Sequence, residues 1–254
     1  MKRKILSNRI LLPRGLSTFL FSACLVAATF TAHAQPPPPP PPPPSPSPPP
    51  PPPPNFSGGA DFNSDGFTDY LLFNPSSSRT AIWYLGAGFL SAAFGPTLPA
   101  GWTVAGTSDV NRDGKPDYLL FNASTRQTAI WFLNNATFIS GALGPTLPTG
   151  WTLIGGADFN IDTKPEYVLF NPSTRQTAIW FLNNATFISG ALGPTLPTGW
   201  TLMGAADFNG NTKPDYVLFN PSTRRTAIWF LNGTAFTSGV FGPTLAAGYS
   251  LASP

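Results

Sequence analysis

The chain repeats itself four times from residue 58 to residue 254, with a period of 48 or 49 residues. The similarity is strongest between the second and third repeats, where residues Ser124 to Leu153 are identical to Ser173 to Leu202. A fixed period of about 40 to 50 residues is typical of folds in which each repeat forms one supersecondary unit and neighbouring units share a core. The sequence therefore predicts four similar units, which start near residues 58, 106, 155 and 204.

Each unit contains four short segments rich in β-branched and aromatic residues. In the second unit they span residues 118–121, 128–133, 137–139 and 151–154, separated by turns at 122–127 and 134–135 and by a break at Gly144-Pro145. Segments of this composition, bounded by Gly, Pro, Asn and Ser, are typical of strands. In residues 128–133 both alternating faces are apolar, with Trp131 on one side and Phe132 on the other. We therefore expect this strand to be covered on both faces.

These features predict an all-β fold, a β-propeller built from four repeats of about 49 residues that each form a four-stranded sheet. The first repeat has no counterpart of the strand at 151–154, whereas the chain ends with a similar segment, Gly248 to Leu251. We expect this C-terminal strand to complete the first sheet and close the ring, which removes two exposed strand edges. Four blades are the lower limit for a propeller, so an open array that forms a larger ring as a homodimer is the alternative.

All eleven acidic residues lie in four nine-residue windows, one in each repeat. The windows read DFNSDGFTD, DVNRDGKPD, DFNIDTKPE and DFNGNTKPD, and positions 1, 3, 5 and 9 carry Asp, Asn or Glu. Oxygen ligands at alternating positions of a tight turn converge on one hard cation, and Ca²⁺ takes roughly six to eight of them. The windows therefore predict four calcium loops. Asx turns without metal are the alternative, because Asp and Asn also hydrogen-bond to their own backbone.

The pattern DxNxDGxxD, followed by an apolar strand and repeated with Trp-bearing strands, resembles the FG-GAP or VCBS repeat of extracellular β-propellers. The resemblance covers residues 58–254. It implies that Ca²⁺ is bound by the side chains at positions 1, 3, 5 and 9 and by the carbonyl of position 7. The implied ligands are Asp61, Asn63, Asp65, Phe67 and Asp69 in the first loop, Asp109, Asn111, Asp113, Lys115 and Asp117 in the second, Asp158, Asn160, Asp162, Lys164 and Glu166 in the third, and Asp207, Asn209, Asn211, Lys213 and Asp215 in the fourth.

The four loops differ at the positions that shape the turn. Position 6 needs a positive φ and is Gly66 or Gly114 in the first two loops, but Thr163 and Thr212 in the others, where a β-branched residue is strained. Glu166 of the third loop is one methylene longer than Asp, and the fourth loop has two carboxylates instead of three. We therefore predict that calcium affinity falls from the first two loops to the third and then to the fourth.

The N-terminal residues predict export. Five basic residues precede an apolar run at about 16–30 and the sequence Ala32-His33-Ala34, so residues 1–34 are expected to be a signal peptide that is cleaved near Ala34. Residues 35–57 form a proline-rich linker, for which polyproline II is expected. No other segment approaches the length of a transmembrane helix. A secreted or cell-surface protein is therefore predicted, with lipidation of Cys24 as the alternative to cleavage.

Cleavage after Ala34 would remove the only Cys, the only His and five of the fourteen basic residues. The remaining chain carries nine basic and eleven acidic residues, so the sequence pI of about 9.2 does not indicate nucleic-acid binding. Without His or Cys, and with its only Glu in a predicted metal loop, the chain lacks the residues of most catalytic sites. We therefore do not expect an enzyme.

The predicted function is a binding or adhesion module with structural calcium, because proteins that the repeat resembles include lectins and adhesion proteins. A carbohydrate-binding lectin with sugar sites between blades is the alternative, since aromatic rings stack on sugars. The candidate ligand-binding residues are Trp102, Trp151, Trp200 and Tyr249, with Arg126, Arg175 and Arg224 in nearby turns. Packing in the core is the competing explanation for the tryptophans, and solvated turns for the arginines. The expected partner is an extracellular glycan or protein.

Overall fold

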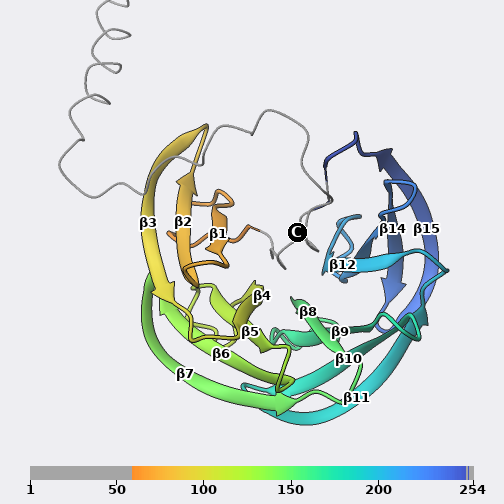
Figure 1. Cartoon of the computed structure of the whole chain (residues 1–254), viewed down its shortest axis with the longest axis horizontal. Helices are drawn as coiled ribbons and strands as arrows, with labels where there is room; N and C mark the ends of the chain where they lie inside the picture. Colours follow the sequence, from red (N-terminus) through yellow and green to blue (C-terminus); the bar gives the residue numbers. More distant parts are fainter. Residues whose placement is uncertain (1–58, 250, 252–254) are drawn as a thin grey trace, which may run out of the picture. The chain divides into compact units, whose positions relative to one another are not determined.

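The computed structural model describes residues 59–249 and 251, which form strands, turns and bends. Fifteen strands make four antiparallel sheets, each of which is one blade, so the predicted all-β propeller with four blades is confirmed (Figure 1). The expected signal peptide and proline-rich linker, residues 1–57, lie outside the described residues. Within residues 59–249 and 251 there is no helix of a length and apolarity that would cross a membrane.

The sheets follow one another along the chain. The first contains β1 (Tyr70–Asn74), β2 (Arg79–Leu85) and β3 (Phe89–Thr97), and the second contains β4 (Trp102–Ser108), β5 (Asp117–Asn122), β6 (Gln127–Asn134) and β7 (Thr137–Thr146). The third contains β8 (Thr152–Ala157), β9 (Glu166–Asn171), β10 (Gln176–Asn183) and β11 (Thr186–Thr195), and the fourth contains β12 (Thr201–Ala206), β13 (Asp215–Asn220), β14 (Arg225–Asn232) and β15 (Ala235–Thr244).

Consecutive sheets pack against each other. Contacts between sheets run along the inner strands, from β4 to β8 to β12, and along the outer strands, from β3 to β7, β11 and β15. Three clusters of buried apolar side chains lie between the first and second, second and third, and third and fourth sheets. Strands β5, β9 and β13 are buried along their whole length, as expected for strands that are covered on both faces. The core is therefore divided among the interfaces between blades.

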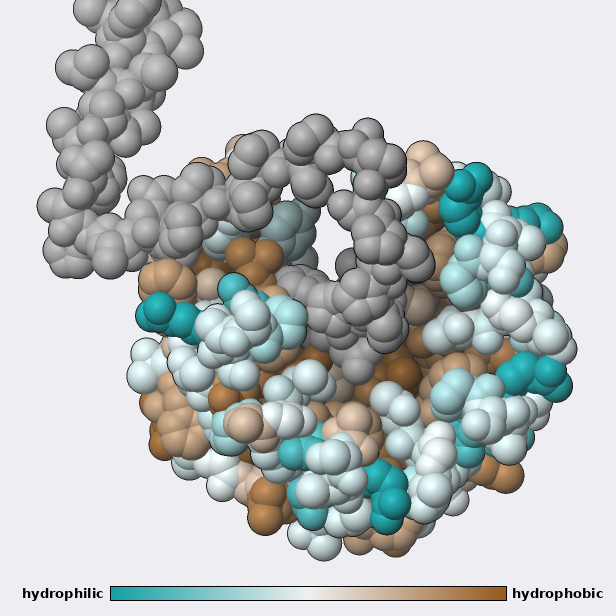
Figure 2. Space-filling model, in the orientation of Figure 1, coloured by the Kyte–Doolittle hydropathy of each residue, from teal (hydrophilic) through white to brown (hydrophobic). Residues whose placement is uncertain are grey.

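The outermost strands carry apolar side chains to the surface, and hydrophobic patches are visible around the rim in Figure 2. The exposed apolar residues of these strands include Leu90, Ile139, Leu143, Ile188, Leu192, Val240 and Phe241. The predicted break at Gly144-Pro145 is wrong, because β7 continues through both residues to Thr146. Proline is tolerated here because β7 is an outer strand, and its pairing with β6 shifts register between Gln127 and Ala129.

The strand predicted at 151–154 forms β8 and pairs with β9, so it belongs to the sheet that follows it. The first sheet correspondingly has three strands, with only an isolated bridge between Ala60 and Asp69 in the place of a fourth. At the other end, the Tyr249 N–H donates to the Ala246 carbonyl at 3.2 Å, the same turn that precedes β4. Residue 250 lies outside the described residues, so closure of the ring by Gly248 to Leu251 stays a prediction.

Candidate metal centre

The four acidic windows form loops of one conformation, each stabilised by its own side chains. In the second loop Asp109 accepts hydrogen bonds from the Asp113 N–H at 3.1 Å and from the Gly114 N–H at 2.9 Å. The Asn111 side-chain oxygen accepts from the same Asp113 N–H at 3.0 Å, and Asp113 Oδ1 accepts from the Lys115 N–H at 2.9 Å. Equivalent bonds recur in the other three loops. These bonds fix the oxygens at positions 1, 3 and 5.

The turn geometry at position 6 is the one that the sequence predicts. Gly66 and Gly114 have φ of 88° and 80°, and Thr163 and Thr212 adopt positive φ of 72° and 66°. The backbone strain expected for a β-branched residue is therefore present in the third and fourth loops.

A second positive φ, at position 4, was not predicted. Ile161 of the third loop has φ of 61°, whereas the fourth loop has Gly210 there, with φ of 75°. The third loop thus holds two β-branched residues in the left-handed region and the fourth holds one. Gly210, at position 4 of the fourth window, was the one sign in the sequence that this position needs a positive φ.

Position 9 lies inside the sheet. Asp69, Asp117 and Asp215 are fully buried. Asp69 accepts from the Phe62 N–H and from the Leu85 N–H, both at 2.9 Å, so it ties the start of the loop to the end of β2. Asp117 and Asp215 make the equivalent pairs of bonds. Burial raises the pKa of Asp117 to about 6, although these backbone hydrogen bonds act in the opposite direction. The position-9 aspartates are therefore braces within the sheets, a role that the sequence did not reveal.

Glu166 departs from this arrangement because of its extra methylene. Its side chain is buried, with 1% of its surface exposed, and Oε2 accepts from the Phe159 N–H at 2.7 Å. Oε1 has no hydrogen-bond partner within the described residues. Burial raises the pKa of Glu166 to about 7, and the charges of Asp162 and Asp158 raise it further. Glu166 therefore leaves one buried oxygen free inside the loop.

The third loop brings three carboxylates together. Oxygens of Asp158, Asp162 and Glu166 lie within 4.8 Å of one another, and no other group of three acidic, His or Cys side chains in residues 59–249 and 251 does so. Carboxylate oxygens are the hard donors that Ca²⁺ prefers, and an ion bound here would offer a partner to the unpartnered Oε1 of Glu166. Among the described residues, the third loop is therefore the one whose three carboxylates could hold a metal ion together, and its turn is also the most strained.

The fourth loop is the least acidic. Although desolvation acts to raise the pKa of Asp207, hydrogen bonds from the N–H groups of Thr212, Asn211, Gly210 and Asn209 hold it below the ordinary value. This carboxylate is therefore satisfied by the backbone of its own loop. The sequence-predicted order of calcium affinity among the loops stays a prediction.

Two basic side chains link the second loop to its neighbours. The Lys115 ammonium group donates to the Ser64 hydroxyl of the first loop at 3.0 Å, and Arg112 donates to the Asp162 carbonyl of the third. In the third and fourth loops the equivalent lysines instead donate to a hairpin asparagine of their own sheet. Lys164 bonds to Asn183 at 2.9 Å and Lys213 bonds to Asn232 at 2.8 Å. Among the three loop lysines, Lys115 is thus the one that does not bond to the hairpin asparagine of its own sheet.

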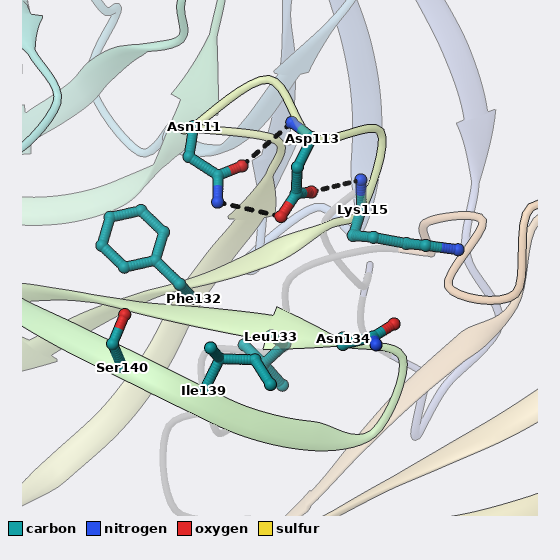
Figure 3. A pocket seen from close by; sticks show the side chains of 8 residues that line it. All are labelled: Asn111, Asp113, Lys115, Phe132, Leu133, Asn134, Ile139 and Ser140. Atoms are coloured by element: carbon teal, nitrogen blue, oxygen red, sulfur yellow. Dashed lines mark hydrogen bonds between the residues drawn. The ribbon is translucent and has the colours of Figure 1, made fainter.

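A cavity of about 490 Å³ lies beside the second loop (Figure 3). Its wall consists of Asn111, Asp113 and Lys115 from the loop, Phe132, Leu133 and Asn134 from β6, and Ile139 and Ser140 from β7. In Figure 3 the ammonium group of Lys115 points away from Asn134, in keeping with its bond to Ser64. An aromatic ring, an amide, a hydroxyl and a carboxylate therefore face one open space whose size is in the range of small-molecule sites.

The predicted aromatic ligand residues do not line this cavity. Trp102, Trp151 and Trp200 are partly buried, and each packs against a different core cluster. Trp200 also stacks on Phe241, with ring centroids 6.1 Å apart. Tyr249 is 71% exposed.

The turn arginines of the second and third sheets make local bonds. Arg126 donates to the Leu147 carbonyl at 3.1 Å, and Arg175 donates to the Thr198 hydroxyl at 2.6 Å. Arg126, Arg175 and Arg224 all have positive φ, between 56° and 61°. Arg126 and Arg175 therefore have hydrogen-bond partners within the chain.

Comparison with known proteins supports the resemblance seen in the sequence. Residues 61–120 match the FG-GAP-like repeat family. No curated protein sequence matches the chain.

Solved structures that match the chain include a protein of unknown function from Bacteroides caccae, at 14% identity and a TM-score of 0.39, over 68% of this chain and 55% of that one. A protein from Lactobacillus plantarum is similar at 13% identity and 0.38, over 74% and 56%. The V. cholerae biofilm matrix protein Bap1 is similar at 16% identity and 0.31, over 72% and 38%. This chain thus spans about half the length of the first two.

Proposed function

We propose that this chain, which carries an FG-GAP-like repeat at residues 61–120 within a four-bladed propeller, is a non-catalytic extracellular binding module stabilised by calcium in its loops. The observation that carries the proposal is that four loops at one register hold their oxygens in place through the same backbone hydrogen bonds. Such preorganisation lowers the cost of ordering the loop around an ion. Bound calcium would supply the positive charge that offsets these oxygens.

The third loop gives the strongest physical reason for an ion. Three carboxylates with oxygens within 4.8 Å repel one another, and the buried Oε1 of Glu166 has no partner in the described residues. A cation would remove both costs, since unpaired buried charge is expensive and opposite charge nearby favours the ionised form. The chain's own residues position the oxygens, and a bound ion would compensate their negative charge.

Thermal unfolding with and without calcium tests this proposal. Extracellular calcium sites commonly have dissociation constants of about 10⁻⁴ to 10⁻³ M, so about 10 mM calcium should stabilise each occupied loop by roughly 1.4 to 2.7 kcal/mol. For a domain of this size that corresponds to a rise in Tm of about 2 to 4 °C for each kcal/mol. The matched control is the same concentration of Mg²⁺ after EGTA treatment. An unchanged Tm in calcium would refute the proposal.

A carbohydrate is the second candidate ligand, and the cavity beside the second loop favours it. Sugars bind to aromatic faces flanked by a few polar groups, and Phe132, Asn134 and Ser140 offer this combination. The duplicated sequence supplies a control, because Asn183 occupies the equivalent position in the third sheet but is bonded to Lys164.

Glycan-array binding by the purified chain, repeated with Asn134→Ala and Asn183→Ala, separates the two asparagines. We expect Asn134→Ala to abolish sugar binding and Asn183→Ala to leave it unchanged. Equal loss in both variants, or no sugar bound by the unmodified chain, would exclude this cavity as a sugar site.

A further inference from the structure

The dipeptide Asn-Gly occurs twice in the chain, as Asn209-Gly210 in the fourth acidic loop and as Asn232-Gly233 in the hairpin between β14 and β15. An asparagine followed by glycine can lose its side-chain amide without an enzyme. The nitrogen of the next residue attacks the side-chain carbon, and glycine allows this close approach because it has no side chain. Both asparagines are exposed, so the hydrogen bonds around each pair decide which one reacts.

The hairpin pair has a polarised side chain. The Lys213 ammonium group donates to Asn232 Oδ1 at 2.8 Å, so it would stabilise the negative charge that develops on this oxygen during attack. Gly233 has φ of 59° in a two-residue turn that is closed by the pairing of Asn232 with Ala235. Its N–H has no hydrogen-bond acceptor among the described residues. The side-chain carbon is therefore activated, and the attacking nitrogen is not held by another bond.

The loop pair is protected by its own hydrogen bonds. The Gly210 N–H donates to Asp207 Oδ1 at 2.8 Å, and the Asn211 N–H donates to Asn209 Oδ1 at 3.1 Å. The nitrogen that would attack is thus held by a carboxylate, whose negative charge opposes the loss of the proton from that nitrogen. We therefore expect the loop pair to react more slowly than the hairpin pair.

The other hairpins have only part of this arrangement. In the third sheet Lys164 donates to Asn183 Oδ1 at 2.9 Å, but the next residue is asparagine. The second sheet has the same hairpin sequence without the lysine contact, because Lys115 bonds to Ser64 instead. Among the described residues, the hairpin of the fourth sheet is thus the one that combines a lysine contact with a following glycine.

We propose that Asn232 is a site of spontaneous deamidation and that Lys213 activates it. The Gly233 nitrogen gives its proton to hydroxide and bonds to the Asn232 side-chain carbon. The bond from that carbon to the amide nitrogen breaks, and ammonia leaves after taking a proton from water. Water then opens the succinimide ring and leaves aspartate or isoaspartate, so that one water is consumed for each ammonia released.

Either product places a carboxylate beside the Lys213 ammonium group, which belongs to the fourth acidic loop. Isoaspartate also adds a methylene to the backbone at the end of β14, where Asn232 pairs with Ala235. The reaction therefore changes the charge of the fourth loop's surroundings, and isoaspartate changes the hairpin as well. The proposal does not depend on whether the loops bind calcium.

Peptide mass spectrometry of the purified chain, incubated at pH 8 in EGTA, tests the proposal. The peptide that contains Asn232 should gain the mass difference between NH₂ and OH, with aspartate and isoaspartate forms separated by chromatography. Peptides that contain Asn209 or Asn183 should stay unchanged over the same time. The chain unfolded in urea is the positive control and should react at both Asn-Gly pairs, because the folded contacts are then absent.

The contribution of the lysine is measured by Lys213→Met, which keeps a side chain of similar length without the ammonium group. Buried donors to a developing oxyanion change rates by about 10² to 10³, and water also reaches this exposed turn, so we expect the reaction at Asn232 to slow by roughly threefold to tenfold. Circular dichroism checks that the variant is folded.

The identical hairpins of the second and third sheets supply a matched pair of variants. Asn135→Gly and Asn184→Gly each create an Asn-Gly pair in the same local sequence, at positions whose φ values of 54° and 51° suit glycine. The two hairpins differ in the lysine contact, which is present at Asn183 and absent at Asn134. Deamidation should therefore be faster at Asn183 in Asn184→Gly than at Asn134 in Asn135→Gly.

Three results would overturn the proposal. The folded chain could keep Asn232 intact for as long as the unfolded chain needs to react. Asn209 could react faster than Asn232 in the folded chain, which would mean that its hydrogen bonds give no protection. Equal rates in Asn135→Gly and Asn184→Gly, together with an unchanged rate in Lys213→Met, would show that the lysine does not activate the amide.

Discussion

Glu166 is the position at which a single amide substitution should stabilise the calcium-free protein. Its Oε2 accepts one backbone N–H, and its Oε1 has no hydrogen-bond partner among the described residues. The carboxylates of Asp158 and Asp162 lie within 4.8 Å of the Glu166 carboxylate. In Glu166→Gln the amide oxygen can keep the bond from Phe159, and the amide NH₂ can donate to the neighbouring carboxylates. The substitution removes a buried charge and satisfies a buried atom at the same time.

The raised pKa sets the size of the effect. A carboxyl group with a pKa of 4.5 in the unfolded chain and about 7 in the folded protein costs about 3 kcal/mol of folding free energy at pH 8. Asp162 is exposed, so solvent screens part of the repulsion, and we expect a gain of about 2 kcal/mol. This corresponds to a rise in Tm of about 4 to 8 °C in EGTA.

The same chemical change at the equivalent position of the first loop should have the opposite sign. Both carboxylate oxygens of Asp69 accept backbone N–H groups, so Asp69→Asn would place an NH₂ donor against an N–H donor in a buried site. Leaving such groups unsatisfied costs about 1 to 3 kcal/mol. Asp69→Asn is therefore the matched control, with an expected loss of stability in EGTA.

Urea unfolding at pH 8 in EGTA measures both variants, and a second series in calcium measures what the ion contributes. In calcium, Glu166→Gln should lose part of its advantage, because the unmodified third loop then gains an ion. If Glu166→Gln were destabilising in EGTA, or if both variants shifted stability in the same direction, the account of Glu166 as an uncompensated carboxylate would be wrong.

Further predictions concern pH, turn strain and metal binding. In EGTA, the free energy of unfolding should fall as pH rises from about 5 to 8. The raised pKa values of Asp117 and Glu166 mean that the folded protein binds more protons than the unfolded chain over this range. Urea unfolding at several pH values measures this free energy, and a rise with pH would contradict the prediction. Thr163→Gly should stabilise the chain by about 1 kcal/mol through relief of a positive φ, measured by urea unfolding, whereas a loss would show that the threonine is unstrained. Titration calorimetry of Asp113→Ala and Asp207→Ala should show a larger loss of calcium binding for the first; equal losses would remove the ranking of the second loop above the fourth.

The sequence predicts the strands and loops well because both depend on local pattern. Residues 128–133 alternate two apolar faces, and they lie within β6 with Ile130 and Leu133 buried. The positive φ at Thr163 also followed from its place in the window. These features are determined within a few residues of the chain, so repetition of the pattern was enough to find them.

The features that the sequence did not reveal depend on distant residues. Gly144 looked like a strand break, but its lack of a side chain makes room for the Tyr167 hydroxyl of the next sheet. Asp117 is predicted as a metal ligand from its window alone, and the structure adds that it accepts a backbone N–H from Leu133, at the end of β6. In both cases the contacting group comes from a different strand or sheet. The sequence pattern around Gly144 or Asp117 therefore cannot show which group each of them contacts.

Consecutive sheets meet through a repeated contact, a tyrosine joint, in which a tyrosine hydroxyl lies against a threonine and a glycine of the preceding sheet, as Tyr167 does against Thr128 and Gly144. This joint bears on how such a chain can change in length. Because each sheet carries such a threonine and glycine on one side and a tyrosine on the other, a duplicated or deleted repeat would meet its new neighbours through a joint of the same kind. The identity of Ser124 to Leu153 and Ser173 to Leu202 is what such a duplication leaves in a sequence. Unequal recombination between repeats could therefore alter the number of blades in one step, and variation in blade number would be tolerated more readily than substitution within a joint.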